Sequence, residues 1–149
     1  MILFLSYARK DQTHIGPLAQ GLRFAGHDLW FDESLIGGEE WWRAILKRIR
    51  SSDVFVAVVS QASLASTACT REREYAVRLG KPILPVAVED VPTQALPPDL
   101  ARRQIVDFAT PDTTAAFRLA GGINALPPTP PCRIHCLPTP TSPCHTCLI

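Results

Sequence analysis

The chain has 149 residues, 46% of them hydrophobic, which fits one domain with a core large enough to fold alone. The formal net charge is +1 with acids and bases interspersed, which excludes a basic face for nucleic acid and an acidic solvating tail. No apolar run approaches the roughly 20 residues that span a bilayer, and Met1–Leu5 lacks the basic start of a signal peptide. We therefore expect a soluble, cytoplasmic protein that binds neither a membrane nor nucleic acid.

The first half of the chain alternates between short apolar runs and helical patterns. Ile2–Leu5 predicts a buried strand, and the apolar spacing within Asp11–Phe24 predicts a helix that ends before Gly26. His27–Phe31 predicts a short edge strand, followed by a loop that contains glycines. Glu39–Arg50 predicts a second helix, with acids at its start and bases near its end as the helix dipole favours.

The strongest strand signal follows that helix. Val54–Val59 consists of apolar, mostly β-branched residues, which is typical of a central strand covered on both faces. Ser63–Leu79 contains the next predicted helix. Pro82–Val88 predicts a fourth strand, whose prolines favour a place near the sheet edge or at strand ends.

The last predicted elements are shorter. Val91–Leu100 predicts a proline-rich loop, and Gln104–Phe108 predicts a weak fifth strand. Asp112–Leu119 predicts a final helix that is stopped by Gly121 and Gly122. Strands that alternate with helices in this way predict an α/β fold with a flavodoxin-like, doubly wound sheet of about five parallel strands.

The composition changes near the C-terminus. Prolines become frequent from Pro127 onward, and Arg133 is the only formally charged side chain there. We therefore divide the chain into a domain over residues 1–125 and a Pro/Cys-rich tail over residues 126–149, which we expect to be disordered.

The cysteines follow the same division. Cys69 is the only cysteine of the predicted domain, which argues against a disulfide-stapled core and favours a reducing compartment. In the tail, Cys132-x-x-His135-Cys136 precedes Cys144-His145-x-Cys147, and these are ligand types that zinc accepts. The short spacing and the lack of a core to orient the ligands argue against a zinc site, so we expect no metal.

A ligand site is expected beyond the carboxyl ends of the strands, where the winding reverses between the first and third strands. The segments Ser6–Arg9, Ser60–Ser63 and Cys69–Glu72 converge there. The sequence contains neither a G-x-G-x-x-G loop nor a P-loop, which disfavours the usual dinucleotide-binding and P-loop enzymes. Ser6 and Ser60 stand where response-regulator receivers need acids, so a receiver-like switch is also disfavoured.

Four motifs, in order along the chain, carry a resemblance to a known family. They are Phe4-Leu-Ser-Tyr7 with Arg9-Lys-Asp11, Leu29-Trp-Phe-Asp32 with Gly37-Gly38 and Glu40-Trp41, Ser52-Asp-Val-Phe-Val-Ala-Val-Val-Ser60, and Ser66-Thr-Ala-Cys69-Thr-Arg-Glu72 with Tyr75-Ala76 and Gly80-Lys-Pro-Ile83. They resemble the first box, the second strand and BB loop, the central strand, and the helix and fourth strand of bacterial-type Toll/interleukin-1 receptor (TIR) domains. The resemblance covers roughly residues 1 to 120.

The resemblance implies an NAD glycohydrolase that cleaves the nicotinamide–ribose bond and yields nicotinamide and linear or cyclic ADP-ribose. NAD would be its substrate, no cofactor is implied, and signalling or anti-phage defence would be its setting. The family's catalytic glutamate corresponds to Glu72. The substrate-binding positions implied with it are Ser6, Tyr7, Arg9, Trp41 and Cys69.

Two positions depart from the family pattern. Ala68 stands where the family has a Trp, and Gly37 precedes Gly38 where many bacterial members have Pro. From the residues alone, the alternating charges of Arg71–Glu74 are typical of exposed helix surface, and Glu74 would point elsewhere on the helix than Glu72.

The alternative is a non-catalytic module that assembles with other TIR domains. Its interface would include the BB-loop residues Ser34, Leu35, Ile36, Gly37 and Gly38. Because Trp41 and Trp42 are adjacent, we expect only Trp42 to join the apolar stripe of its helix, with Trp41 left for stacking or an interface.

Overall fold

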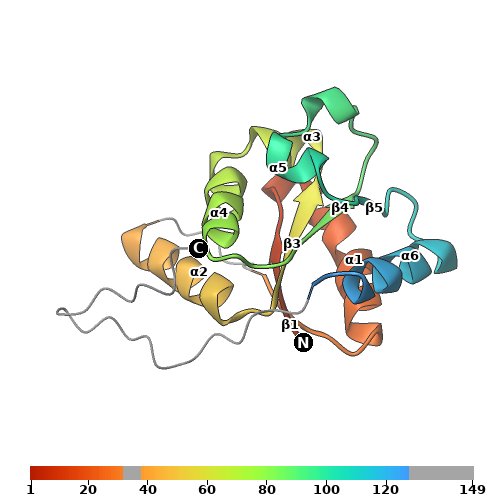
Figure 1. The fold of residues 1–149 in the computed structure, drawn as a ribbon, viewed down its shortest axis with the longest axis horizontal. Coiled ribbons are helices and arrows are strands. Elements are labelled where there is room, and N and C mark those ends of the chain that lie inside the picture. The colour runs from red at the N-terminus through yellow and green to blue at the C-terminus, as the bar shows by residue number, and fades with distance from the viewer. Residues whose placement is uncertain (32–37, 128–149) are drawn as a thin grey trace.

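The computed structural model describes residues 1–31 and 38–127. One sheet of five parallel strands has the order β2-β1-β3-β4-β5 (Figure 1), which confirms the predicted flavodoxin-like α/β fold. The strands are β1 (Ile2–Ser6), β2 (Asp28–Trp30), β3 (Val54–Val59), β4 (Ile83–Ala87) and β5 (Val106–Asp107). The α-helices are α1 (Gln12–Phe24), α2 (Glu39–Ser51), α3 (Gln61–Ala65), α4 (Thr67–Arg78), α5 (Pro98–Ala101) and α6 (Thr113–Asn124), and the 3-10 helices are η1 (Arg9–Asp11) and η2 (Thr93–Ala95).

Some predicted features lie outside the described residues. These are the BB-loop positions Ser34, Leu35, Ile36 and Gly37 and the tail beyond Pro127 with its cysteines. Within the described ranges, none of the helices combines the length and the apolar character that crossing a membrane requires.

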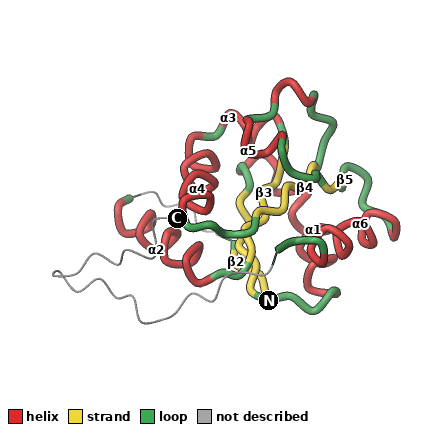
Figure 2. Tube along the Cα trace, in the orientation of Figure 1, coloured by secondary structure: helices red, strands yellow, loops and turns green. Residues whose placement is uncertain are grey.

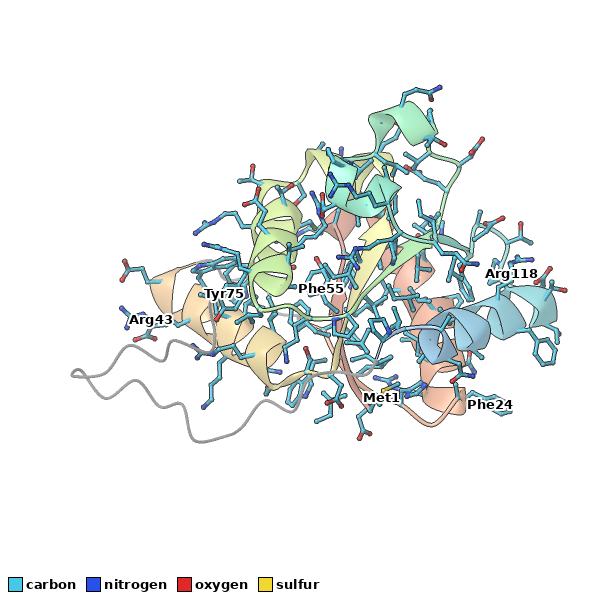
Figure 3. All side chains as sticks on the ribbon, in the orientation of Figure 1. Met1, Phe24, Arg43, Phe55, Tyr75 and Arg118 are labelled. Atoms are coloured by element: carbon cyan, nitrogen blue, oxygen red, sulfur yellow. The ribbon has the colours of Figure 1, made fainter. Side chains whose placement is uncertain are left out.

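Helices cover both faces of the sheet, with α1 and α6 on one face and α2 and α4 on the other (Figures 1 and 2). Side chains along each strand alternate between the two cores. Leu3 and Leu5 of β1 join the core under α1, whereas Phe4 stacks on Phe55 of β3 in the core under α2, with ring centroids 5.6 Å apart. Figure 3 shows Phe55 in the interior, between α4 and the sheet. Burial on both faces explains why β3 is apolar at every position.

Two helices occupy the segment in which one was predicted. Ser60 caps α3, because its Oγ accepts from the Ser63 backbone N–H at 2.9 Å while the Ser63 Oγ accepts from the Ser60 backbone N–H at 2.9 Å. Ser66 then ends α3 and caps α4, its Oγ accepting from the Cys69 backbone N–H at 3.3 Å. Hydroxyl side chains that satisfy free backbone donors start a new helix here.

The prediction that Gly121 and Gly122 stop the last helix is wrong. The helix α6 continues through both to Asn124. A Cβ on Gly122 would lie 2.7 Å from Cγ2 of Val106 on β5, so the glycine allows the helix backbone to approach the sheet.

The prolines of the fourth strand lie as predicted near the sheet edge or at a strand end, since β4 is next to the edge strand β5 and Pro82 directly precedes β4, although Pro85 is in the interior of the strand. Val88 N–H donates to Val59 of β3, and Phe108 N–H donates to the Ala87 carbonyl, so successive residues of β4 alternate between its neighbours. Pro85 therefore faces the β5 side, where the register reaches only Val86 and Ala87.

The predicted proline-rich loop at residues 91–100 is not wholly irregular, because it contains η2 and the start of α5. A proline at the first turn of α5 is compatible with its helical backbone, since the N–H that proline lacks has no intrahelical acceptor there. The helix α5 carries Leu100, which is buried in the core under α2.

Candidate functional site

The last residue of β1 and a carboxylate of α4 meet at the carboxyl edge of the sheet. Ser6 Oγ donates a hydrogen bond of 2.6 Å to Oε2 of Glu72, and the two side chains are buried. The chain winds in one direction from β1 to β2 and in the other from β3 to β4, so this edge is the topological switch point where ligands bind in open α/β sheets.

Cys69 lies one turn before Glu72 on the same face of α4. Burial raises the pKa of the Cys69 thiol, and the charges of Glu72 and Asp11 raise that pKa further. Hydrogen bonds with Ser66 and Ser6 oppose these effects without reversing them. The thiol is therefore held in its protonated form, which makes it a small wall residue of this site and a poor nucleophile.

A second serine–carboxylate pair lies at the end of the neighbouring strand. Ser60, directly after β3, donates from Oγ to Oδ2 of Asp11 at 2.5 Å, and Asp11 is buried at the end of η1. Asp11 belongs to one of the family motifs in the sequence, but it was not among the predicted site residues. Asp11 comes shortly after the first strand, but no local pattern shows that its carboxylate is buried against a serine 49 positions away.

The residue after Glu72 is a buried cation. Arg73 is 7% exposed, and its Nε donates to Oδ2 of Asp99 on α5 at 2.8 Å. Arg73 was not among the predicted site residues, because the alternating charges of Arg71–Glu74 are typical of a solvent-exposed helix. Cys69, Glu72, Arg73 and Ala76 form the buried face of α4, and their spacing of three, four and seven residues is the signal that marks one face of a helix.

A small cavity lies beside these side chains. Its volume is about 10 Å³, near the smallest that holds one water-sized oxygen. Ser6, Cys69 and Arg73 line it, together with Leu100 of α5. Glu72 adjoins the cavity through its hydrogen bond to Ser6.

The other proposed substrate-binding residues lie apart from this cavity. Arg9 is exposed at the start of η1, and Tyr7 is half-buried with its ring edge-on to Phe31 at 6.4 Å. Trp41 and Trp42 are both half-buried and both pack against the core under α2, so the prediction that only one could join it is wrong. Large aromatic rings at the first turn of α2 reach the core from either flank.

Gly38 is the described residue of the predicted BB-loop interface. It precedes α2 with φ of 154°, a conformation that favours glycine. In residues 1–31 and 38–127, no group of three or more His, Cys, Asp or Glu side chains is placed to hold a metal ion.

Comparisons with known proteins cover the part of the chain that forms the sheet and its helices. A family model described as "TIR domain" matches residues 3–120. No curated protein matches the chain. The solved TIR domain of the Toll-related receptor TRR-2 from Hydra magnipapillata is similar with a TM-score of 0.66 and 18% sequence identity, over 82% of this chain and 95% of that chain.

Two further solved structures are similar. A metazoan TIR-STING receptor from C. gigas, in complex with 2',3'-cGAMP, has a TM-score of 0.65 and 22% identity over 81% of this chain and 38% of that chain. The CMP N-glycosidase BcmB of Clostridium botulinum has a TM-score of 0.57 and 14% identity over 83% of this chain and 98% of that chain. At these identities the similarity shows a shared fold.

Proposed function

Because the chain belongs to the TIR domain family, we propose that it cleaves the nicotinamide–ribose bond of NAD, with Glu72 as the catalytic carboxylate. The observation that carries this proposal is the 2.6 Å hydrogen bond from Ser6 to Glu72, which holds a buried carboxylate at the ligand-binding edge of the sheet. A neighbour with the same fold is named an N-glycosidase, which supports this class of reaction on such a sheet.

The proposed chemistry suits a single carboxylate. When the bond from ribose to the cationic pyridinium breaks, its electron pair leaves with nicotinamide and positive charge develops on the ribose. The Glu72 carboxylate stabilises that charge, and the Ser6 hydroxyl fixes the position of the carboxylate. Nicotinamide leaves as a neutral group, so the step requires no general acid. Attack by water gives ADP-ribose, and attack by a group of the same nucleotide gives a cyclic product.

The cavity beside Ser6 must widen to admit NAD, because its volume of about 10 Å³ accommodates little more than one oxygen atom. The resemblance to enzymatic TIR domains implies that a neighbouring copy's BB loop completes the pocket. We therefore propose that the active form is an assembly with other TIR domains, working in the cytoplasm in signalling or anti-phage defence.

The test is release of nicotinamide from NAD by the protein at high concentration. Replacing the carboxylate in Glu72→Gln is expected to lower the rate at least about 100-fold, because it removes the charge that stabilises the transition state. Glu74→Gln is the matched control, since Glu74 is exposed on the same helix, and its rate should stay within about twofold of the wild type. Equal rates for the wild type and Glu72→Gln would contradict the proposal.

The second candidate is a non-catalytic TIR–TIR interaction module. The small cavity supports it, because the described residues leave room beside Ser6 for little more than one oxygen atom. This function predicts self-association that depends on concentration, with no nicotinamide released at any concentration. Measuring both properties on the same sample distinguishes the two candidates.

A further inference from the structure

Arg73 is a nearly buried cation next to the candidate catalytic carboxylate. It is 7% exposed and follows the candidate catalytic residue on α4. A buried guanidinium requires anionic partners, since its removal from water costs several kcal/mol. Its protein partner is Asp99, whose own side chain remains 31% exposed. The pair thus joins the buried face of α4 to the first turn of α5.

The pair with Asp99 satisfies only part of the Arg73 guanidinium. N–H donors are present on Nε and on both Nη atoms, and Nε is the one that donates to Asp99, at 2.8 Å. Across residues 1–31 and 38–127 the two Nη atoms have no protein acceptor. Arginine binds carboxylate or phosphate most strongly with two parallel N–H donors, and the Nη atoms keep such a fork for another oxyanion.

Arg73 lines the cavity beside the candidate catalytic pair. Arg73 and Ser6 line this cavity together, and Ser6 donates to Glu72. A cavity of about 10 Å³ is near the size of one oxygen atom, which is the part of a phosphate that a guanidinium contacts first. Leu100 forms part of the wall and lies next to Asp99 on α5, so the ion pair of Arg73 with Asp99 lies beside the cavity.

The charges around the cavity require such a cation if the substrate is anionic. The carboxylates of Glu72 and Asp11 are close enough to Cys69 for both to act on its thiol electrostatically. These carboxylates repel a phosphate that approaches Glu72. Bringing like charges together in a site of low dielectric constant costs free energy. Arg73 is the cation that lines the cavity and offsets this repulsion.

We infer that Arg73 binds a phosphate of the substrate, so that the site selects phosphorylated N-ribosyl compounds over the corresponding nucleosides. This inference rests on the proposed function of the site and adds to it a specificity-determining residue. It also assigns Asp99 the role of holding the guanidinium through Nε while the Nη atoms are left for the phosphate.

The test is a binding measurement without turnover, made on the full chain carrying Glu72→Gln under the assembly conditions of the activity assay. Nicotinamide mononucleotide and nicotinamide riboside are the probes, since they differ only by the phosphate. Calorimetry should show the mononucleotide binding at least about tenfold more tightly than the riboside, as expected for a charge-assisted contact. Adding Arg73→Met should abolish this difference.

A second variant separates phosphate binding from a structural role. Asp99→Asn breaks the same ion pair but leaves the guanidinium, so the preference for the mononucleotide should persist or increase. If Arg73 only anchors α5, Arg73→Met and Asp99→Asn will weaken both probes alike, which overturns the inference. Arg78→Met, an exposed arginine on the same helix, should leave both affinities unchanged. If Arg73→Met does not fold, the double variant Arg73→Met/Asp99→Asn is used in its place. The double variant leaves neither partner of the ion pair as an unpaired charge.

Failure of this inference differs from failure of the proposed function. Equal affinities of the two probes for the unsubstituted Arg73 site overturn the inference even if the wild type releases nicotinamide. Absence of nicotinamide release by the wild type, with the phosphate preference intact, contradicts the proposed catalysis and leaves Arg73 as an anion-binding residue.

Discussion

The hydroxyl of Ser6 donates a hydrogen bond to Glu72, and removing it tests whether the position of this carboxylate matters for catalysis. Ser6→Ala should slow nicotinamide release about tenfold and lower the free energy of unfolding by about 1–3 kcal/mol, because a buried carboxylate loses a hydrogen bond. Steady-state kinetics and urea unfolding measure the two effects. Ser51→Ala is the control, since Ser51 is exposed and its hydroxyl donates only to the Arg48 carbonyl. An unchanged rate in Ser6→Ala would contradict the positioning role.

The buried thiol of Cys69 should make the free energy of unfolding depend on pH. Because burial raises its pKa in the folded state, the unfolded chain loses this proton first as the pH rises. The contribution of the protonated thiol to the free energy of unfolding is fully present below the ordinary thiol pKa. It is lost as the pH rises through the folded-state pKa. Unfolding free energies should therefore fall more steeply at alkaline pH in the wild type than in Cys69→Ala. Equal slopes would argue against a raised pKa.

At the scale of an element, the close approach of α6 to the sheet should make the protein sensitive to a side chain at Gly122. Gly122→Ala should lower the free energy of unfolding by about 1–3 kcal/mol, because the new Cβ would lie 2.7 Å from Val106 and 3.1 Å from Leu84. Gly121→Ala is the matched control, since a Cβ there meets nothing within 4 Å, and it should stabilise the helix by up to about 1 kcal/mol. Urea unfolding of both variants measures the difference, and a similar gain in both would contradict the packing argument.

The C-terminal end of α2 is held by a lysine from a distant segment. Lys81 is 7% exposed, and its Nζ donates to the carbonyls of Arg50 at 2.8 Å and Ser52 at 2.6 Å. An ammonium at this helix end satisfies free carbonyls and complements the helix dipole. Lys81→Met should lower the free energy of unfolding by about 1–3 kcal/mol, whereas Lys47→Met, at an exposed position of α2, should change it by less than about 0.5 kcal/mol.

At the scale of the whole molecule, we expect catalysis to require assembly through the BB-loop interface. A substitution in that interface tests this expectation. Gly38→Asp should abolish concentration-dependent self-association and, with it, nicotinamide release, because a side chain is introduced at a backbone with φ of 154°. Gly80→Asp is the control, since Gly80 also has positive φ, at 67°, but follows the C-terminal end of α4 and is not part of the proposed BB-loop interface. Sedimentation at several concentrations measures the association. Intact association in Gly38→Asp would place the interface elsewhere.

Much of the fold was predictable because the signals are local. The apolar run of β3 spans a few residues, and the amphipathic pattern of α2 spans a few helical turns. The alternation of such strands and helices favours one order of strands in the sheet. The place of Pro85 inside β4 was not predictable from local signals, because the cost of its missing N–H depends on how far the neighbouring strand β5 extends. The prediction for Gly122 was wrong because its function is packing against β5 and not helix termination.

The candidate site divides in the same way. The sequence by itself determined that Ser6 and Ser60 end neighbouring strands and, through the family resemblance, that Glu72 is the carboxylate to consider. Only the tertiary structure decided that Arg73 is buried and paired with Asp99, 26 positions away. The periodicity of a helix shows which side chains share a face, but the free energy of burying a charge depends on a partner supplied by a distant segment.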